Sequence, residues 1–278
     1  MRDGLLLTLV FAAIALHAAP SRADSIAVER LVARKAAILE LLHAKAEKAL
    51  VTLAQDDSYA GYFATQDQAE RARLKARIDQ ISLRAQSRFH VEEMCLIDPS
   101  GTEVSRIVGG HAAHDLSDEE ASAIFFAPGF ALAPRTVYVS PAYLSPDADK
   151  WVIAYVTPII VEDKKRAILH YEHNLGVYQD AVAQGLSGND AFIVAVTADG
   201  RVVADSRRPI PIEKRGDSED PADYFEAFAW QGFDLETLKR KVGSDGMAGS
   251  ATLRVDGVEY DIAYRIVHDW TLVGIGRQ

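Results

Sequence analysis

The chain has 278 residues and a formal net charge of −10, and hydrophobic residues make up 49% of it. This composition is typical of a folded globular protein and excludes a disordered or collagen-like chain. With 40 acidic and 30 basic side chains it lacks the basic surface that a nucleic-acid backbone requires, and its single cysteine excludes an internal disulfide and a zinc knuckle built from cysteines.

Residues 1–23 have the features of an export signal. An apolar run from Leu5 to Ala19 follows Arg2, and at about 15 residues it is shorter than the roughly 20 that a membrane-spanning helix needs. Pro20 ends the run, and small residues precede a cleavage site after Ala23. We therefore predict a protein secreted to the periplasm, with an uncleaved signal that anchors it as the alternative.

Two helices are predicted after the signal, within residues 24–88. Residues 24–56 contain neither Pro nor Gly, and their apolar side chains recur at helical spacing. At 1.5 Å per residue such a helix is about 45–50 Å long, so we expect it to run alongside two structural units. A second helix is expected over 67–88, with a turn at 58–62.

The remainder of the chain repeats one order of elements twice. The first copy, residues 89–182, has the pattern of a hairpin, a helix and three strands, expected at 91–97, 103–108, 117–126, 136–140, 151–160 and 167–175. The second copy, residues 183–278, has the same order, expected at 192–197, 202–205, 221–230, 250–255, 258–267 and 270–276. The predicted fold class is α+β, with two antiparallel sheets flanked by helices.

Four segments resemble one known family. They are 137–144 (VYVSPAYL), 153–159 (IAYVTPI), the hairpin 96–106 and the closing run 260–274. In order and spacing they resemble the double Cache, PAS-like sensor domains of bacterial chemoreceptors, histidine kinases and cyclic-dinucleotide enzymes. The resemblance covers nearly the whole chain after the signal and implies two PAS-like units, the first membrane-distal and the second membrane-proximal.

The resemblance also implies a ligand site in the first unit. The matching positions are Tyr138, Ser140, Tyr143, Tyr155 and Glu172. Glu172 would pair with a ligand ammonium group and the tyrosines would form walls, although strand and core roles are the alternative interpretation for all of them. The Arg-x-Trp-Tyr segment of the amino-acid-binding members is missing, so an amine, an amino acid or a carboxylate each stays open as the ligand.

We predict no metal and no cofactor. His170 and His173 flank Glu172, but positions 170 and 173 of a strand face opposite sides. The pair His111 and His114 and the Asp147–Asp149 segment are interpreted as solvated loops. Cys95 lies in the apolar run 94–97, which indicates a buried, inert thiol.

The sequence contains none of the motifs that mark common enzyme classes. There is no nucleophile elbow, phosphate loop, zinc-hydrolase helix or dinucleotide fingerprint. The leading hypothesis is a non-enzymatic small-molecule sensor that passes its state to a membrane-bound signalling protein, because the chain ends at Gln278 directly after the last predicted strand. The alternatives are an interaction module or homodimer that uses the helix at 26–55, and an unrecognised hydrolase.

Overall fold

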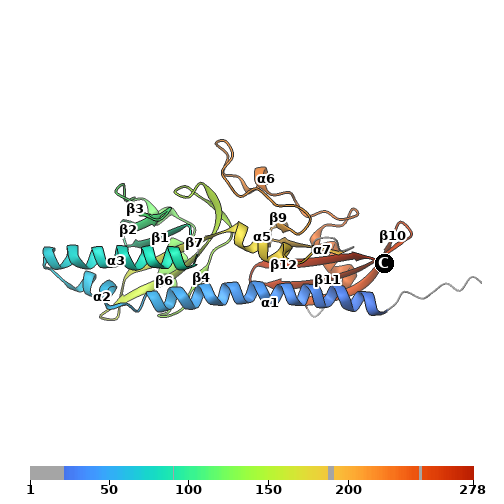
Figure 1. The fold of residues 1–278 in the computed structure, drawn as a ribbon, viewed down its shortest axis with the longest axis horizontal. Helices are drawn as coiled ribbons and strands as arrows, with labels where there is room; N and C mark the ends of the chain where they lie inside the picture. The colour runs from blue at the N-terminus through green and yellow to red at the C-terminus, as the bar shows by residue number, and fades with distance from the viewer. Residues whose placement is uncertain (1–21, 90, 187–190, 244–245) are drawn as a thin grey trace, which may run out of the picture.

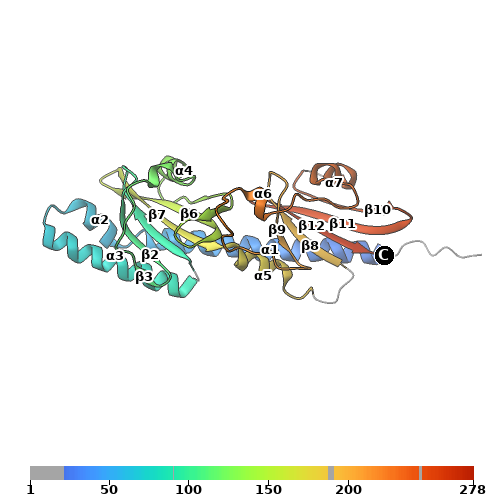
Figure 2. The same ribbon diagram turned by 90° about the horizontal axis from the view of Figure 1, so that it is seen from above.

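The computed structural model describes residues 22–89, 91–186, 191–243 and 246–278, so residues 1–21 of the predicted signal lie outside the described part. Two antiparallel sheets lie one after the other along a single long helix (Figure 1; Figure 2). No helix among the described residues has both the length and the apolar character needed to cross a membrane.

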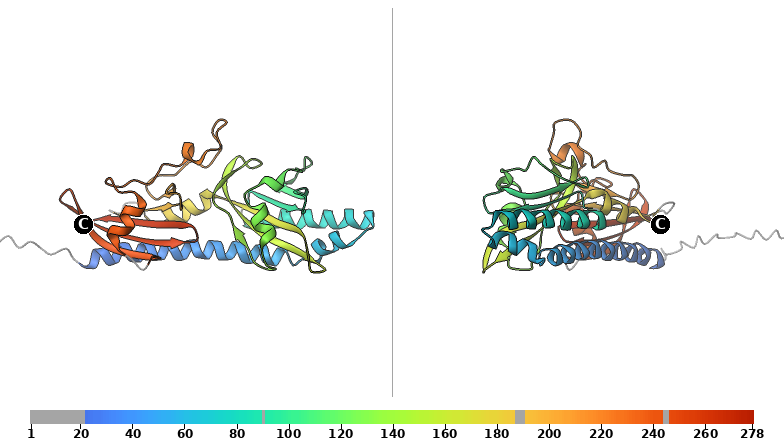
Figure 3. Two further views of the ribbon diagram at one scale, coloured as in Figure 1. Left: turned by 180° about the vertical axis from the view of Figure 1, so that it is seen from behind. Right: turned by 60° about the vertical axis from the view of Figure 1, so that its left-hand side comes forward.

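The long helix α1 (Arg22–Leu53) runs alongside both sheets (Figure 3), and one of its faces is buried from Val28 to Leu50. The buried positions on this face recur three or four residues apart, as a packed helix requires. They are Val28, Val32, Ala36, Leu39, His43, Ala46 and Leu50, of which His43 alone is polar. The approach to the second sheet is close at Gly274, where a Cβ atom would lie 2.4 Å from a methyl carbon of Val32.

The first sheet has seven strands in the order β3-β2-β1-β7-β6-β4, with β5 paired to β6. Its elements are α2 (Asp57–Ala64), α3 (Gln68–Phe89), β1 (Glu93–Ile97), β2 (Glu103–Val108), β3 (His111–Ala112), η1 (Glu120–Ser122), α4 (Phe126–Ala131), β4 (Tyr138–Val139), β5 (Tyr143–Ser145), β6 (Lys150–Val161) and β7 (Lys164–Asn174). Helices α1 and α3 cover one face of this sheet, and α4 packs on the opposite face.

The second sheet has five strands in the order β10-β11-β12-β8-β9. Its elements are α5 (Leu175–Ala183), β8 (Ala191–Val196), β9 (Val202–Asp205), α6 (Pro221–Tyr224), α7 (Leu235–Val242), β10 (Ala248–Val255), β11 (Val258–Val267) and β12 (Trp270–Arg277). Here α1 covers one face and α7 the other. The predicted α+β class with two sheet units is confirmed.

Three local predictions were wrong. The expected turn at 58–62 is helix α2, whose first turn is capped by the Asp56 carboxylate. The helix expected at 117–126 is replaced by η1 and the later helix α4, because the backbone of Ser117 exchanges hydrogen bonds with Glu103 of β2 instead of starting a helix. The helix expected at 221–230 is only the short α6, with α7 following it.

A buried polar cluster lies where α1 crosses between the two sheets. The Nδ1 atom of His43 is 2.6 Å from the Tyr155 hydroxyl of β6, which is 2.6 Å from the Tyr178 hydroxyl of α5. The His43 ring also lies 4.0 Å from the ring of His268, in the turn between β11 and β12. One side chain of α1 therefore contacts both units.

Acidification is expected to weaken the fold through this cluster. Burial, with repulsion from His268 and His173, lowers the pKa of His43 to about 3. The imidazole is thus neutral in the folded chain, and the stability it contributes is complete above pH 6.5 and falls by about 1.4 kcal/mol per pH unit below it. In urea unfolding at pH 7 and pH 5, His43→Asn should lose less stability on acidification than the parent. The exposed His114→Asn variant should match the parent, and equal losses in all three chains would contradict the expectation.

Candidate functional site

A pocket of about 610 Å³ lies on the face of the first sheet that α1 and α3 leave open. Its walls are formed by strands β1, β5 and β7, by the segment from η1 to α4 and by the loop before α6. The lining residues are Glu93, Ser117, Glu119, Glu120, Ser122, Ala123, Ile124, Phe125, Ala142, Tyr143, Leu144, Pro146, Asp147, Trp151, Glu172, Glu219 and Pro221. Six of these described residues are acidic and none is Lys, Arg or His.

Glu172 and Tyr143 meet at the inner end of this pocket. The Tyr143 hydroxyl donates a hydrogen bond to Oε1 of Glu172 and lies 3.2 Å from Nε2 of His170. His170 and Glu172 share a face of β7, as strand alternation predicts, and the His170 ring stacks on Phe125 with 4.0 Å between ring centroids. The second oxygen of Glu172, Oε2, is buried without a hydrogen-bond partner among the described residues.

The buried acids of the pocket hold their protons more tightly than exposed acids do. Burial raises the pKa of Glu172 to about 7. Burial also raises the pKa of Glu93 well above its usual range, and the Glu172 charge adds to this rise. His170 is affected in the opposite sense, since burial lowers its pKa to about 3. The pocket therefore has two buried carboxyl groups with raised pKa values next to an imidazole with a lowered pKa, and no Lys or Arg is among its described lining residues.

Cys95 lies behind the pocket and is buried, as predicted. Its sulfur lies 2.8 Å from Oε1 of Glu93 and 3.2 Å from Oε1 of Glu103, and the single thiol proton can be donated to either oxygen. Glu103 and Arg106 both lie on this side of β2 because the β1–β2 register shifts between Leu96 and Ile97. Arg106 forms ion pairs with Glu103, Asp115 and Asp147, so its charge is already shared among three acids.

The structure brings together two of the five predicted site residues, Tyr143 and Glu172. The Ser140 hydroxyl donates to the Pro141 carbonyl and accepts from the amide of Ala154, so it supports the backbone of β6. Tyr138 packs beside α4 and is not part of the pocket lining. Tyr155 faces α1 on the opposite side of the sheet, in the His43 cluster.

Sequence reasoning missed several residues of the pocket. Glu93 had a usable signal, since a carboxylate at the start of an apolar strand shares its face with Cys95 and Ile97. Phe125 and Trp151 had no such signal, because aromatic side chains in apolar segments usually belong to the core. Glu219 lies in a loop of the second unit, and only the folded chain places it at the pocket.

The histidines considered as metal ligands lie as the sequence interpretation expected, whereas Asp147 is not in a solvated loop. His173 faces the opposite side of β7 from His170 and packs against the rings of Tyr155 and Tyr171. His111 and His114 are exposed. Asp147 pairs with Arg106, which makes it part of the pocket wall.

Comparisons with known proteins agree with this architecture. No family model and no curated protein matches the chain. Among solved structures, the sensory domain of the Campylobacter jejuni chemoreceptor Tlp3 with isoleucine bound has a TM-score of 0.70 at 12% identity and covers 92% of this chain and 93% of its own. The ligand-binding domain of the Pseudomonas fluorescens chemoreceptor CtaA with L-serine has a TM-score of 0.61 at 13% identity. The alignment covers 92% of this chain and 97% of the CtaA domain.

At these identities the likeness establishes the fold. The chain has the fold of the sensory ligand-binding domains of bacterial chemoreceptors, and the resemblance to double Cache sensor domains is confirmed at this level.

Proposed function

We propose that this chain is a sensory ligand-binding protein whose pocket on the first sheet binds a small organic cation with an ammonium group. The observation that carries the proposal is the acidic lining of the pocket, where Glu172 holds a buried carboxylate oxygen that has no partner among the described residues. A carboxylate in such a place forms a strong charge-assisted hydrogen bond with an ammonium group. The sensory domain of Tlp3 and the ligand-binding domain of CtaA, which share the fold, have isoleucine and L-serine bound, respectively.

The aromatic residues of the pocket wall also favour a cationic ligand. Phe125, Tyr143 and Trp151 place three aromatic rings on the pocket, and aromatic faces attract cations. The Nε1 atom of Trp151 is a buried donor without a partner in the described residues, so the ligand should also carry a hydrogen-bond acceptor. A volume of about 610 Å³ is within the usual range for small-molecule sites.

Among the three ligand classes left open by the sequence, these features favour an amine. An amino acid or a carboxylate needs a positive partner for its carboxyl group. Arg106, which contacts the pocket residue Asp147, is occupied by ion pairs with Glu103, Asp115 and Asp147. The lining instead offers an ammonium group five acidic side chains besides Asp147, which is paired with Arg106.

The second unit would receive the signal through the loop that borders the pocket. The amide of Trp151 donates to the carbonyl of Ile212 at 2.7 Å, and the amide of Lys214 donates to the carbonyl of Asp149 at 2.7 Å. We propose that residues 89–182 form the ligand-binding, membrane-distal-type unit and residues 183–278 the proximal one, that the signal at 1–23 exports the chain to the periplasm, and that it acts without catalysis. Leu41 of α1 is 53% exposed, which supports contact with a membrane-bound signalling partner or a second copy through this helix.

Calorimetric titration with matched pairs of compounds tests the proposal. Ethanolamine should bind and ethylene glycol should not, and the same contrast is expected between 4-amino-1-butanol and 1,4-butanediol, because in each pair an ammonium group replaces one hydroxyl of a molecule of similar size. A bound amine at a hundred times its Kd should stabilise the fold by about 2.7 kcal/mol. L-serine and L-valine serve as the zwitterionic comparison.

The outcomes separate the candidate functions. Binding of the amino acids but of no amine would retain the sensor and contradict the cation pocket. Binding of neither class, together with a dimer that Leu41→Glu dissociates in sedimentation analysis, would favour the interaction module. Turnover of any compound would contradict the non-enzymatic assignment.

A further inference from the structure

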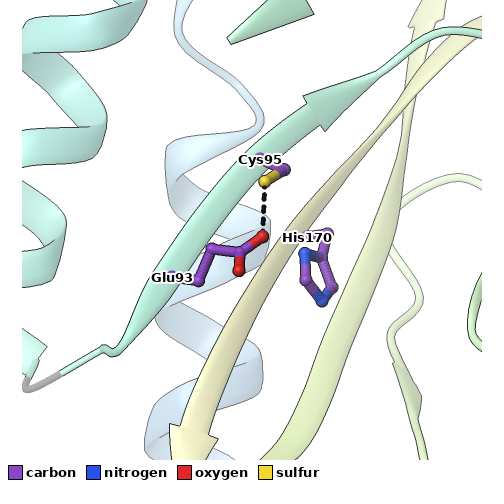
Figure 4. Close-up of side chains that lie close together, drawn as sticks. All are labelled: Glu93, Cys95 and His170. Carbon is purple, nitrogen blue, oxygen red and sulfur yellow. Dashed lines mark hydrogen bonds between the residues drawn. The ribbon is translucent and has the colours of Figure 1, made fainter. Parts of the chain in front are cut away.

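Three chemically different metal-binding side chains meet behind the pocket. Glu93 and Cys95 project from β1 toward the side on which His170 projects from the neighbouring strand β7 (Figure 4). Cys95 and His170 are paired directly across these antiparallel strands. One carboxylate oxygen, the sulfur and one ring nitrogen of the three residues all lie within 4.8 Å of one another, and all three residues are at most 4% exposed.

We propose that this Glu93–Cys95–His170 cluster binds one late first-row divalent metal ion of the Zn²⁺ class. Thiolate, imidazole and carboxylate together are the donors that Zn²⁺ uses, whereas Ca²⁺ and Mg²⁺ take oxygen donors. Bond lengths of 2.0–2.3 Å place tetrahedral donors roughly 3.5 Å apart. Small side-chain rotations therefore suffice to bring the three donors to one centre, and the sulfur already lies 2.8 Å from Oε1 of Glu93.

A second observation points independently to a ligand at this place. The Nδ1 atom of His170 is buried and has no hydrogen-bond partner among the described residues, while its ring is held by stacking on Phe125. Buried polar atoms are almost always partnered, because an unpaired one costs about 1–3 kcal/mol. A metal bond would give both ring nitrogens of His170 a partner, because one nitrogen would bind the ion and the other would contact the Tyr143 hydroxyl.

The excess of acidic side chains around the cluster also favours binding of a cation. Within the described chain, neither Glu93 nor Glu172 forms an ion pair with a lysine or arginine, and Arg106 is shared among Glu103, Asp115 and Asp147. On binding, the thiol proton of Cys95 and any proton on Glu93 leave to solvent, and the ion gains a thiolate and a carboxylate. The resulting centre is neutral and involves no change of oxidation state. Glu172 is not one of the three proposed ligands, so the metal centre and the amine proposed for the pocket are compatible.

Cobalt titration of the full chain, first stripped with a chelator, tests the site. Because Cys95 is the sole cysteine, any thiolate-to-cobalt charge-transfer absorption reports this site alone. We expect the absorption to saturate at one Co²⁺ per chain and to disappear when Zn²⁺ is added in excess. Cys95→Ser should abolish the absorption, and Glu93→Gln and His170→Asn should each weaken Co²⁺ binding at least tenfold. The matched control His111→Asn, an exposed histidine of the same sheet, should bind as the parent does.

Two results would overturn the proposal. One is the lack of a charge-transfer absorption in the stripped parent chain. The other is unchanged Co²⁺ affinity in both Glu93→Gln and His170→Asn, which would mean that the thiol binds cobalt without them. Circular dichroism melting checks that each variant is folded. If Cys95→Ser unfolds, Co²⁺ titration of Glu93→Gln or His170→Asn still tests the site. Amine titration in the presence of chelator keeps the two proposals apart, since it depends on Glu172 and not on the metal.

Discussion

Replacing Glu172 by Gln is expected to weaken amine binding by at least about 30-fold. Glutamine preserves the shape of the side chain but removes the negative charge that would face the ligand ammonium. Breaking one half of a buried charge pair costs about 2–5 kcal/mol, and 2 kcal/mol corresponds to about 30-fold in Kd. Glu172 is only 2% exposed, so bulk water cannot replace the lost interaction.

Calorimetry on the parent and on two matched variants would measure this effect. Glu119→Gln removes an exposed acid from the same pocket and should change the Kd by less than about threefold, because exposed ion pairs contribute little. Tyr143→Phe should have an intermediate effect, since it removes the hydroxyl that orients Oε1 of Glu172. The unliganded Glu172→Gln protein should melt no lower than the parent, because Gln carries no charge to be buried. Equal affinity in Glu172→Gln and Glu119→Gln would remove Glu172 from the recognition site.

The strands of the fold were predictable because a buried strand has a local sequence pattern, an apolar run between turn residues. β9 (Val202–Asp205) and β11 (Val258–Val267) lie at the predicted bounds, and β6, β8, β10 and β12 differ by one or two residues. The short helices were less predictable. Ser117 and Glu120 have the spacing of a capping box, yet Ser117 is hydrogen-bonded to Glu103 of β2, a partner 14 residues away.

The site was only half predictable because a strand pattern identifies faces but not which face carries the pocket. Tyr155 pairs with Tyr171, and Ala154 pairs with Glu172, so the register places Tyr155 on the face opposite Glu172. The family motif contains both tyrosines and cannot separate them. Tyr143 reaches Glu172 from β5, a three-residue strand that had no signal of its own.

The remaining walls of the pocket come from segments far apart in the sequence. Glu93 and Glu172 are brought together by the pairing of β1 with β7, and Glu219 arrives in the loop that leads to α6. The acidity of the pocket is therefore a property of the fold. In the sequence, each of these acidic residues taken separately has the pattern of an ordinary surface residue. A net charge of −10 indicates that the protein is acidic but does not indicate where the acids converge.

Trp151→Ala is expected to lower the free energy of unfolding by about 3–5 kcal/mol, the usual cost of truncating a buried tryptophan. Trp151 is 1% exposed, and its ring lies 5.1 Å from that of Tyr224 and 4.7 Å from that of Phe225. Urea unfolding would measure the loss, which is a large part of the 5–15 kcal/mol typical of a domain. Trp230→Ala is the matched control, because Trp230 is only half-buried and packs outside the pocket. A loss no larger than that of the control would show that Trp151 does not hold the two units together.

Trp151 also lies on a route of direct contacts from the pocket to the second sheet. It lines the pocket, packs on Phe225, and the next residue, Glu226, accepts a hydrogen bond from the amide of Val202 at the start of β9. Amine binding should therefore slow amide exchange at β9 as well as at β5. In Trp151→Leu, which keeps an apolar side chain at this position, the slowing at β5 should persist while that at β9 should disappear. Slowing at β9 that survives this change would place the route elsewhere, for example through the backbone hydrogen bonds of Trp151 and Lys214 or through α1 and its His43 cluster.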